Sequence, residues 1–490
     1  MSRRPANDLS FLAAALVALL LAAAGPARAE APLPDLQQRI DQLVSTGAMG
    51  DTFWGIAVMD ARTGERLYAR NADHLLMPAS TNKLLTAATA ISALGPDHRF
   101  RTTLYFDGEI DGSTMRGDLY IRGSGDPTFG SSAMKPAANP LRTWARRLAR
   151  MGIERIDGRI VGDDDAFDDR PYAEGWDVDY LTWQASSWLG LSTSGLSYND
   201  NIAEVRIAAT SAGEPPAVSV VPAGYLNIEN QATTSRYRGS TLQWDRSLGT
   251  ETFTIEGTIG NSYAGTFEKP VHNPTKFTAY AFRKHLVEAG IRVEKASVRD
   301  VDDLSEKPDY DNIDPLLVHL SPPLRDILEV MNHESNNFYA EHIFRTFAYG
   351  GSTEGGEKRV KALLKQAGVE AEPLSIQDGS GLSRKDLVTA GAMTKMLAYM
   401  RDHPNGEAFL STIAQGGDSE STLKYRMRGL PVRAKTGSLA HVRALAGYAE
   451  TTSGRLLTFA LFANNYTVPS YRVTQAMDRV VMTLTATSVS

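Results

Sequence analysis

Residues 77–94 read MPASTNKLLTAATAISAL, and the fold is best interpreted outward from this stretch. Pro78 stands just ahead of a run of Ala, Leu and Thr, and Gly95-Pro96 follows it; these are start and stop signals of a helix. Beyond its first turn the run is almost wholly apolar, so the helix is predicted to be buried. Ser80 and Lys83 stand three residues apart at its start, which places both side chains on one helix face.

The segments on either side predict one sheet with helices upon it. Before the helix, an amphipathic stretch over 35–44 is followed by strand patterns at 54–59 and 66–70, with turn residues between them. Near the other end of the chain, 324–347 predicts one long helix, 445–448 and 456–463 read as paired strands, and 471–484 as a final helix. The two ends of the chain are therefore predicted to form one antiparallel sheet, with the middle as an insertion.

The middle of the chain carries a weak internal repeat. A helical pattern over 141–151 is followed by Gly152-Ile153 and a strand that ends near Asp163. A second helical pattern over 277–289 is followed by Gly290-Ile291 and a strand that ends near Asp300. Two copies are too few for a solenoid, so the pattern predicts a pair of similar α/β units.

Three short motifs could supply a nucleophilic serine centre. They are the S-x-x-K at Ser80, a Ser-Asn-Asn at 335–337 and a Lys-Thr-Gly at 435–437. A serine hydroxyl is a poor nucleophile until a neighbour takes its proton, and Lys83 can do so if burial and nearby cations lower its pKa. Lys435 could provide such a cation and bind a substrate carboxylate. Asn337 could hold Lys83, and Ser335 could relay a proton to the leaving amine.

Other occurrences of the same motifs lack this context. Ser132 begins an S-x-x-K that is followed at once by Pro136, which prevents a long helix there. Ser421 begins another in a short, charged stretch, and Ser197 begins a second S-x-N. Only Ser80 begins a long apolar helix that follows a hairpin.

The spacing of the candidate ligands disfavours metal and phosphate sites. His333-Glu334 begins like the zinc motif H-E-x-x-H, but Asn337 stands where the second histidine is needed. The acidic residues at 163–165 and 168–169 do not have the spacing of an EF-hand loop, so a solvated acidic turn is the preferred interpretation. The glycines around 123 and 379–381 lack a Walker lysine and are better explained by turns.

Taken in order, the three motifs resemble those of penicillin-binding protein 4-type D-alanyl-D-alanine carboxypeptidases and endopeptidases, the class C low-molecular-mass penicillin-binding proteins. The large separation between Ser80 and Ser335 is typical of that group. The resemblance also covers the stretches 123–127, 163–167, 321–324, 378–384 and 435–439. It implies an α/β (α+β) fold: a penicillin-recognising serine transpeptidase/β-lactamase-like domain with a five-stranded antiparallel sheet, flanking helices and two inserted smaller domains. The implied division is 30–96 with 313–490 as the catalytic domain, 97–186 with 264–312 as inserted domain II, and 187–263 as inserted domain III.

The resemblance also implies a role for each motif residue. Ser80 would be the acylated nucleophile and Lys83 its base, while Ser335, Asn337 and Lys435 complete the catalytic set. The backbone N–H groups of Ser80 and Ser438 would form the oxyanion hole. Substrate-binding residues would be Thr436, Gly437 and Ser438 on the edge strand, and Asp163, Phe167 and Arg384 near the side chain of the peptide stem. Asn336 replaces the more common Asp in the middle of S-x-N, an exchange expected to matter little.

The implied function is a serine D-Ala-D-Ala carboxypeptidase and D,D-endopeptidase that acts on peptidoglycan stem peptides and is inhibited by β-lactams. No metal or organic cofactor is expected. Two alternatives remain: a β-lactamase or esterase on the same fold, and a non-catalytic peptidoglycan-binding module. The balance of the two peptidase activities and the oligomeric state stay open at this point.

Composition fits this interpretation. The chain has 490 residues, a formal net charge of -6 and no cysteine, which disfavours nucleic-acid binding and excludes thiol catalysis and Cys-ligated zinc. An uncharged run over 11–24 follows Arg3-Arg4 and precedes Ala27-Arg28-Ala29, which predicts a signal peptide over 1–29. The mature protein is expected to be secreted, with the periplasm as its compartment and no integral membrane segment.

Overall fold

The computed structural model describes residues 34–183, 185–186, 191–295 and 297–487. The predicted signal peptide over 1–29 lies outside these residues. Within the described ranges, no helix is long and apolar enough to cross a membrane.

A five-stranded antiparallel sheet forms the centre of the main unit, as predicted. Its strand order is β18-β19-β20-β1-β2, so the three strands from the C-terminal part of the chain lie together and join the two N-terminal strands where β20 pairs with β1. β1 is central and almost entirely buried because β20 and β2 flank it and helices cover both faces. β18 is an edge strand and contains the Lys-Thr-Gly motif. The bounds are β1 (Phe53–Asp60), β2 (Arg66–Arg70), β18 (Val432–Leu439), β19 (Val442–Glu450) and β20 (Leu456–Asn464).

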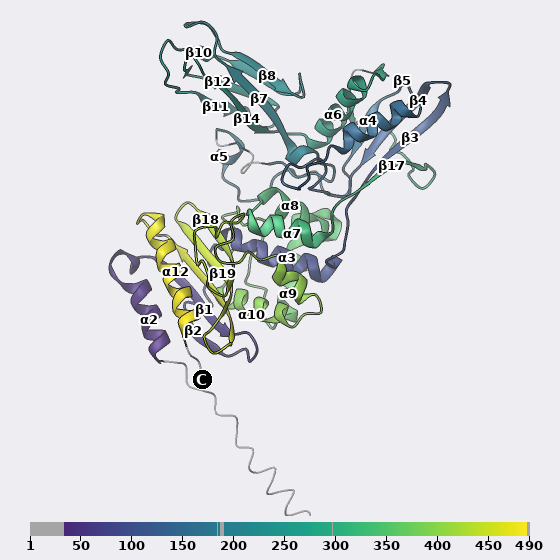
Figure 1. The fold of residues 1–490 in the computed structure, drawn as a ribbon. Coiled ribbons are helices and arrows are strands. Elements are labelled where there is room, and N and C mark those ends of the chain that lie inside the picture. The colour runs from purple at the N-terminus through teal and green to yellow at the C-terminus, as the bar shows by residue number, and fades with distance from the viewer. Residues whose placement is uncertain (1–33, 184, 187–190, 296, 488–490) are drawn as a thin grey trace, which may run out of the picture.

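Helices cover both faces of this sheet (Figure 1). On one face, α2 (Pro34–Ser45) packs with α12 (Ser470–Ala486) over an apolar layer. On the other face, α3 (Asn82–Leu94) is surrounded by helices and has most of its residues buried, as its apolar sequence predicts. The helices around it are α7 (Leu324–His333), α8 (Asn337–Thr346), α9 (Thr353–Gln366), α10 (Ala390–Arg401) and α11 (Gly406–Ser411).

The prediction of a single helix over 324–347 is wrong, although both halves of this stretch are helical. The structure has two helices, α7 and α8, separated by a sharp break at 334–336. Ser335 adopts a left-handed backbone conformation with φ of 61°, which no helix can contain. Asn336 then caps α8, because its side chain accepts a hydrogen bond from the Tyr339 N–H at 3.0 Å. The break therefore places the Ser-Asn-Asn motif on a tight corner.

The inserted segment lies between α3 and α7 in the sequence and projects away from the five-stranded sheet (Figure 1). Its largest sheet has seven strands, and β17 pairs with β3 there, so this sheet extends beyond the expected boundary at residue 313. Two three-stranded sheets and a two-stranded sheet form the rest. The seven-stranded sheet contains β3 (Arg101–Asp111), β4 (Thr114–Arg122), β5 (Arg155–Asp157), β6 (Ile160–Asp163), β15 (Arg292–Val293), β16 (Arg299–Asp300) and β17 (Pro315–Leu320). The smaller sheets contain β7 (Ile202–Ala208), β8 (Ala217–Val221), β9 (Asn227–Asn230), β10 (Thr233–Thr234), β11 (Gln243–Arg246), β12 (Thr252–Glu256), β13 (Thr258–Ile259) and β14 (Ala264–Pro270).

The internal repeat appears as two adjacent units of the seven-stranded sheet. Helices α4 (Pro140–Arg150) and α6 (Pro274–Glu288) pack against each other, and each begins at an asparagine cap followed by proline. The strands after them pair in parallel, β5 with β15 and β6 with β16. The predicted pair of similar α/β units is therefore confirmed. A short helix, α5 (Val178–Leu181), lies in the connection that returns toward the main unit.

Candidate active site

Ser80 lies on a tight turn at the beginning of α3. A short 3-10 helix over Ala79–Thr81 precedes α3, and Ala79 has a φ of 46°, so the chain turns sharply just before the serine. Ser80 is half-buried, and its Oγ is 3.2 Å from the Nζ of Lys83, one helical turn further on. The structure thus joins these two residues as the S-x-x-K spacing predicts.

Lys83 is fully buried and held by two further acceptors. Its Nζ donates to the Asn337 side-chain carbonyl at 2.7 Å and to the backbone carbonyl of Ser380 at 2.7 Å. Burial lowers the pKa of the Lys83 ammonium to about 7, against the opposing effect of the Asp378 and Glu341 carboxyl groups. A substantial fraction of Lys83 is therefore neutral near pH 7 and able to accept the Ser80 proton.

A loop over 378–384 supplies the Ser380 carbonyl. Asp378 is buried and accepts hydrogen bonds from the backbone N–H groups of Gly381 and Ser383, from the Ser380 hydroxyl, and from the Trp176 indole in the inserted segment. Gly381 has a φ of 80°, and a Cβ there would lie 2.0 Å from the Ala79 carbonyl oxygen. Only glycine allows this loop to approach the Ser80 turn so closely.

Glu341 of α8 binds the backbone of the same loop, 378–384. It is buried, and its Oε1 accepts hydrogen bonds from the backbone N–H groups of Gly379 at 3.1 Å and Ser380 at 2.9 Å. Burial, with a smaller contribution from Asp378, raises the pKa of the Glu341 carboxyl to about 8. Burial also raises the pKa of the neighbouring Asp386 carboxyl well above its usual value. Glu341 and Asp386, two of the acids at the base of the site, therefore keep their protons to a higher pH than ordinary carboxyl groups do.

The corner at 334–336 places Ser335 of the Ser-Asn-Asn motif beside Lys435 of the Lys-Thr-Gly motif. Lys435 is buried, and its Nζ donates to the Ser335 Oγ at 2.8 Å and to the Thr436 backbone carbonyl at 2.9 Å. Burial and the charge of Lys83 lower the pKa of the Lys435 ammonium well below its usual range. The structure thus brings the five predicted catalytic residues into two hydrogen-bonded groups: Ser80 and Asn337 around Lys83, and Ser335 with Lys435.

The edge strand β18 lies against the turn that carries Ser80. A Cβ on Gly437 would lie 2.8 Å from the Pro78 carbonyl oxygen and 3.1 Å from the Ala79 Cβ, so the glycine permits this close approach. Ser438 is exposed on the same strand, and the Thr436 hydroxyl donates to the Thr422 hydroxyl at 2.8 Å. Residues 414–416 pair with the first half of β18 through the Gly416 and Ala434 N–H groups. Among the described residues, the outer side of β18 over 436–438 is the part available to pair with an extended peptide.

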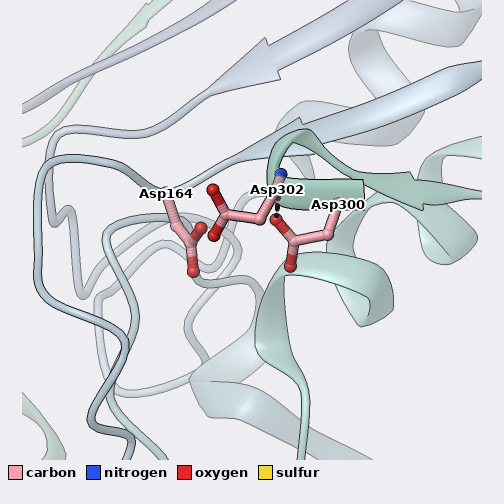
Figure 2. A group of neighbouring side chains, drawn as sticks. All are labelled: Asp164, Asp300 and Asp302. Atoms are coloured by element: carbon pink, nitrogen blue, oxygen red, sulfur yellow. Dashed lines mark hydrogen bonds between the residues drawn. The ribbon is translucent and has the colours of Figure 1, made fainter. Parts of the chain in front are cut away.

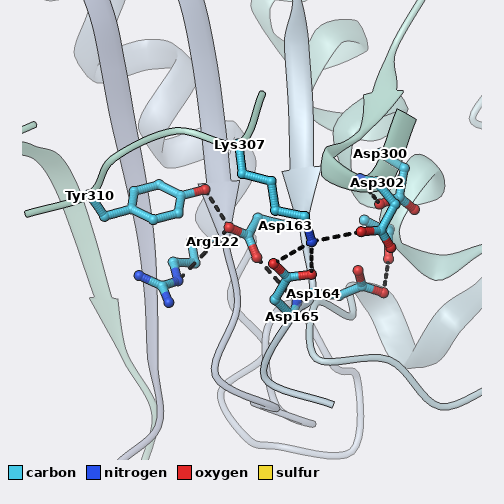
Figure 3. Close-up of polar contacts among 9 residues, drawn as sticks. Arg122, Asp163, Asp164, Asp165, Asp300, Asp302, Lys307 and Tyr310 are labelled. Atoms are coloured by element: carbon cyan, nitrogen blue, oxygen red, sulfur yellow. Dashed lines mark hydrogen bonds and ion pairs between the residues drawn. The ribbon is translucent and has the colours of Figure 1, made fainter. Parts of the chain in front are cut away.

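The remaining predicted substrate residues lie in different surroundings. Arg384 forms an ion pair with Asp177 of the inserted segment at 3.1 Å. Asp163 is 1% exposed at the end of β6, where it accepts a hydrogen bond from Tyr310 (Figure 3). Phe167 is 6% exposed and packs against His342 of α8. Asp163 also pairs with Arg122 at 3.9 Å. None of these contacts of Asp163 and Phe167 involves a residue of the Ser80 cluster.

Beside the acidic turn near Asp163, three carboxyl groups from two segments of the insertion lie close together. Single oxygens of Asp164, Asp300 and Asp302 lie within 4.8 Å of one another (Figure 2). Hydroxyl groups of Ser194 and Thr275 donate to Asp164, and Lys307 binds Asp302 at 2.7 Å and Asp165 at 2.8 Å (Figure 3). These donors explain the turn as a local network in the insertion.

Several residues of the site were not assigned from the sequence. Ser380 supplies a carbonyl to Lys83, Glu341 holds the loop, and Trp176 reaches it from the insertion. The 378–384 stretch is part of the resemblance, but Arg384 alone received a role there. The glycines that flank Ser380 were the available signal, since they indicate a backbone in close contact with another segment.

Comparison with known proteins agrees with this geometry. The sequence profile of the D-Ala-D-Ala carboxypeptidase 3 (S13) family matches residues 36–486. The chain belongs to this family. It is 31% identical over 475 residues to a D-alanyl-D-alanine carboxypeptidase of Actinomadura sp. (strain R39), covering 93% of this chain and 86% of the relative. It is 27% identical over 419 residues to the D-alanyl-D-alanine carboxypeptidase DacB of Haemophilus influenzae, covering 81% of this chain and 82% of the relative.

Its fold is also that of a solved member. The crystal structure of penicillin binding protein 4 from Haemophilus influenzae superposes with a TM-score of 0.75 at 23% identity, covering 91% of this chain and 98% of that one. The predicted penicillin-recognising fold is therefore confirmed. The interpretation of the chain as a serine peptidase is confirmed separately, by its S13 family and by its named carboxypeptidase relatives.

Proposed function

We propose that this S13-family peptidase is a D-Ala-D-Ala carboxypeptidase and D,D-endopeptidase that works through an acyl-enzyme on Ser80. The observation that carries the proposal is the position of Lys83, buried, 3.2 Å from Ser80 Oγ and with its pKa lowered to about 7. A base that titrates near neutral pH beside a serine hydroxyl is what general base catalysis requires. The carboxypeptidase names of the relatives support the choice of substrate.

The proposed acylation step transfers one proton and exchanges one bond. Ser80 Oγ attacks the carbonyl carbon of the penultimate D-alanine, and Lys83 takes the hydroxyl proton. The backbone N–H groups of Ser80 and Ser438 stabilise the oxyanion. As the C–N bond breaks, the Ser335 hydroxyl passes a proton to the leaving amine. Ser335 is then reprotonated by the two lysines, Lys83 and Lys435, of which Lys435 donates to its Oγ at 2.8 Å.

Deacylation returns the enzyme to its starting state. Water attacks the ester carbonyl, Lys83 takes a proton from the water, and the C–O bond to Ser80 breaks with return of that proton to Ser80 Oγ. A free D-alanine as leaving group gives carboxypeptidase activity, while a second stem peptide as leaving group gives endopeptidase activity. The chemistry at Ser80 is the same in both cases.

β-Lactams are the proposed inhibitors, because their strained amide mimics the D-Ala-D-Ala bond. A crystal structure of the Haemophilus influenzae protein in complex with a β-lactam supports this proposal. We also propose a secreted, periplasmic location, where the peptidoglycan substrate lies. Asp163, Phe167 and Arg384 stay proposals as substrate-side-chain contacts, and Arg384, paired with Asp177 at 3.1 Å, has the most support.

Labelling with a fluorescent penicillin tests the proposal. A long-lived adduct on the wild type that is lost in Ser80→Ala and kept in Ser132→Ala is expected, together with release of D-alanine from a peptide ending in D-Ala-D-Ala. Rapid destruction of the penicillin without a lasting adduct would instead identify a β-lactamase. An intact penicillin and an intact peptide would favour a peptidoglycan-binding module without turnover.

A further inference from the structure

A loop over 418–429 lies between the corner of Ser335 and the edge strand β18. Its Thr422 N–H donates to the carbonyl of His333, the last residue of α7, at 3.0 Å. Its Thr422 hydroxyl accepts from Thr436 of β18 at 2.8 Å. The loop therefore borders the side of the site on which Lys435 and Thr436 face the departing group.

The loop is firmly anchored to the main unit. Leu423 and Met427 are buried in the apolar layer beneath α12. The Arg426 guanidinium binds the Asp478 carboxylate of α12 through Nη2 at 2.6 Å and Nε at 3.1 Å. A half-buried bidentate pair of this kind fixes orientation as well as position. The side chains between these anchors are thus presented in a defined direction.

Those side chains form a cationic and aromatic patch, defined here as Lys424, Tyr425 and Arg428. Tyr425 is 78% exposed, with the Lys424 Nζ at 5.5 Å and the Arg428 guanidinium at 5.3 Å from its ring centre. Neither Lys424 nor Arg428 takes part in an ion pair with another described residue. Glu420 lies nearer the other end of the loop, beside a cavity that is also lined by His333 and Glu334.

The position of the patch matters for the size of the leaving group. A free D-alanine ends at its carboxylate, which the proposed mechanism places beside Lys435 and Thr436. Lys424 is two residues beyond Thr422, so their Cα atoms lie at most about 7 Å apart. A leaving group that continues as a second peptide would have to pass over the cationic and aromatic patch.

We propose that the cationic and aromatic patch binds the leaving-group side of cross-linked substrates, where a second peptide carries free carboxylates. The proposal rests on the proposed function and refines it: Lys424, Tyr425 and Arg428 would select anionic peptides beyond the scissile bond. Exposed cations interact with carboxylates over a distance that salt screens, so this selectivity is sensitive to ionic strength.

The test compares two substrates in one enzyme. One substrate is a linear stem peptide ending in D-Ala-D-Ala, and the other is a cross-linked dimer of stem peptides with free carboxylates. For Lys424→Ala/Arg428→Ala, the ratio of kcat/KM for the dimer to kcat/KM for the linear peptide is expected to fall about tenfold at low salt. The wild-type ratio is expected to approach that of the variant as salt is raised.

A matched control removes the same charge elsewhere. Lys358→Ala/Lys365→Ala takes two exposed lysines from α9, where they pair with Glu354 and Glu372, and is expected to keep the wild-type ratio. An unchanged ratio in Lys424→Ala/Arg428→Ala, an equal loss in the control, or a wild type that cleaves only the linear peptide would each overturn the proposal. Absence of activity on both substrates would instead refute the proposed function itself.

Discussion

The indole Nε1 of Trp176 donates a hydrogen bond to the Asp378 carboxylate at 2.8 Å, which links the inserted segment to the loop that holds Lys83. The next residue, Asp177, pairs with Arg384 at the end of the same loop at 3.1 Å. The insertion is thus joined at two points to the support of the proposed base. A change in the insertion can therefore reach the chemistry without touching Ser80.

Trp176→Phe tests this link, because it keeps the ring and removes the N–H. Hydrogen bonds to a charged group contribute about 1.5–3 kcal/mol, and Asp378 keeps its other donors. We expect a loss of about 1–2 kcal/mol in unfolding free energy and a several-fold slower acylation by penicillin. Trp183→Phe in the same segment is the control, since its side chain is exposed. Equal effects of the two variants would show that the hydrogen bond is unimportant.

The pH dependence of acylation follows from the pKa of Lys83, lowered to about 7. The base must be unprotonated, so the second-order rate constant for penicillin acylation should rise about tenfold per pH unit below pH 7 and level off above it. Lys83→Arg keeps a cation that does not lose its proton, and should not acylate at any pH. A wild-type rate that is constant from pH 5 to pH 9 would rule out Lys83 as the base.

Local patterns in the sequence predicted the central sheet with its helices, and they picked out the motif residues that the structure brings together. Ser80 and Lys83 meet because three residues of helix separate them, and that relationship can be read without any tertiary contact. The two paired strands were predicted over 445–448 and 456–463 because a clear turn separates their apolar residues, and the structure extends them to 442–450 and 456–464. The order of the three motifs then indicated which of several S-x-x-K stretches belongs to the site.

Features that depend on tertiary contacts were missed. The apolar periodicity of α7 and α8 continues across residues 334–336, so nothing local announced that Ser335 leaves the helical conformation. Ser380 and Lys83 are far apart in the chain, and a backbone carbonyl carries no residue-type signal. Asp163 and Phe167 were chosen by resemblance, whereas their burial depends on tertiary contacts: Asp163 lies against Tyr310 within the insertion, and Phe167 packs against His342 of α8.

Gly381→Ala tests whether the 378–384 loop needs its close approach to Ser80. The new Cβ would lie 2.0 Å from the Ala79 carbonyl oxygen in a backbone with φ of 80°, so the two segments must separate. Gly368→Ala is a matched control, since its φ is 71° but nothing lies within 4 Å of the new Cβ. We expect the control to lose about 1 kcal/mol from left-handed strain alone. Gly381→Ala should lose more stability and most of its penicillin acylation; equal losses in both variants would contradict the contact.

Glu341→Gln tests the charge of Glu341 alone, because the glutamine keeps an oxygen that can accept the Gly379 and Ser380 N–H groups of the 378–384 loop. Its pKa is raised to about 8, above the value of about 4.3 in an unfolded chain, so the folded protein keeps this proton over a pH range in which the unfolded chain loses it. The stabilisation from the retained proton is complete below the unfolded pKa and is lost as pH rises through the folded one. The glutamine resembles the protonated acid and does not titrate.

The stability of Glu341→Gln relative to wild type should therefore increase with pH, by at most about 1.4 kcal/mol per unit between about pH 5 and pH 8, and then level off. Chemical unfolding at several pH values measures this difference, and titrations that the two proteins share cancel from it. Glu341→Ala leaves the Gly379 and Ser380 N–H groups without their acceptor and should be less stable than Glu341→Gln throughout. A difference between wild type and Glu341→Gln that does not vary with pH would mean that Glu341 is already ionised in the folded protein, and the site would then hold a carboxylate pair rather than a neutral acid beneath Lys83.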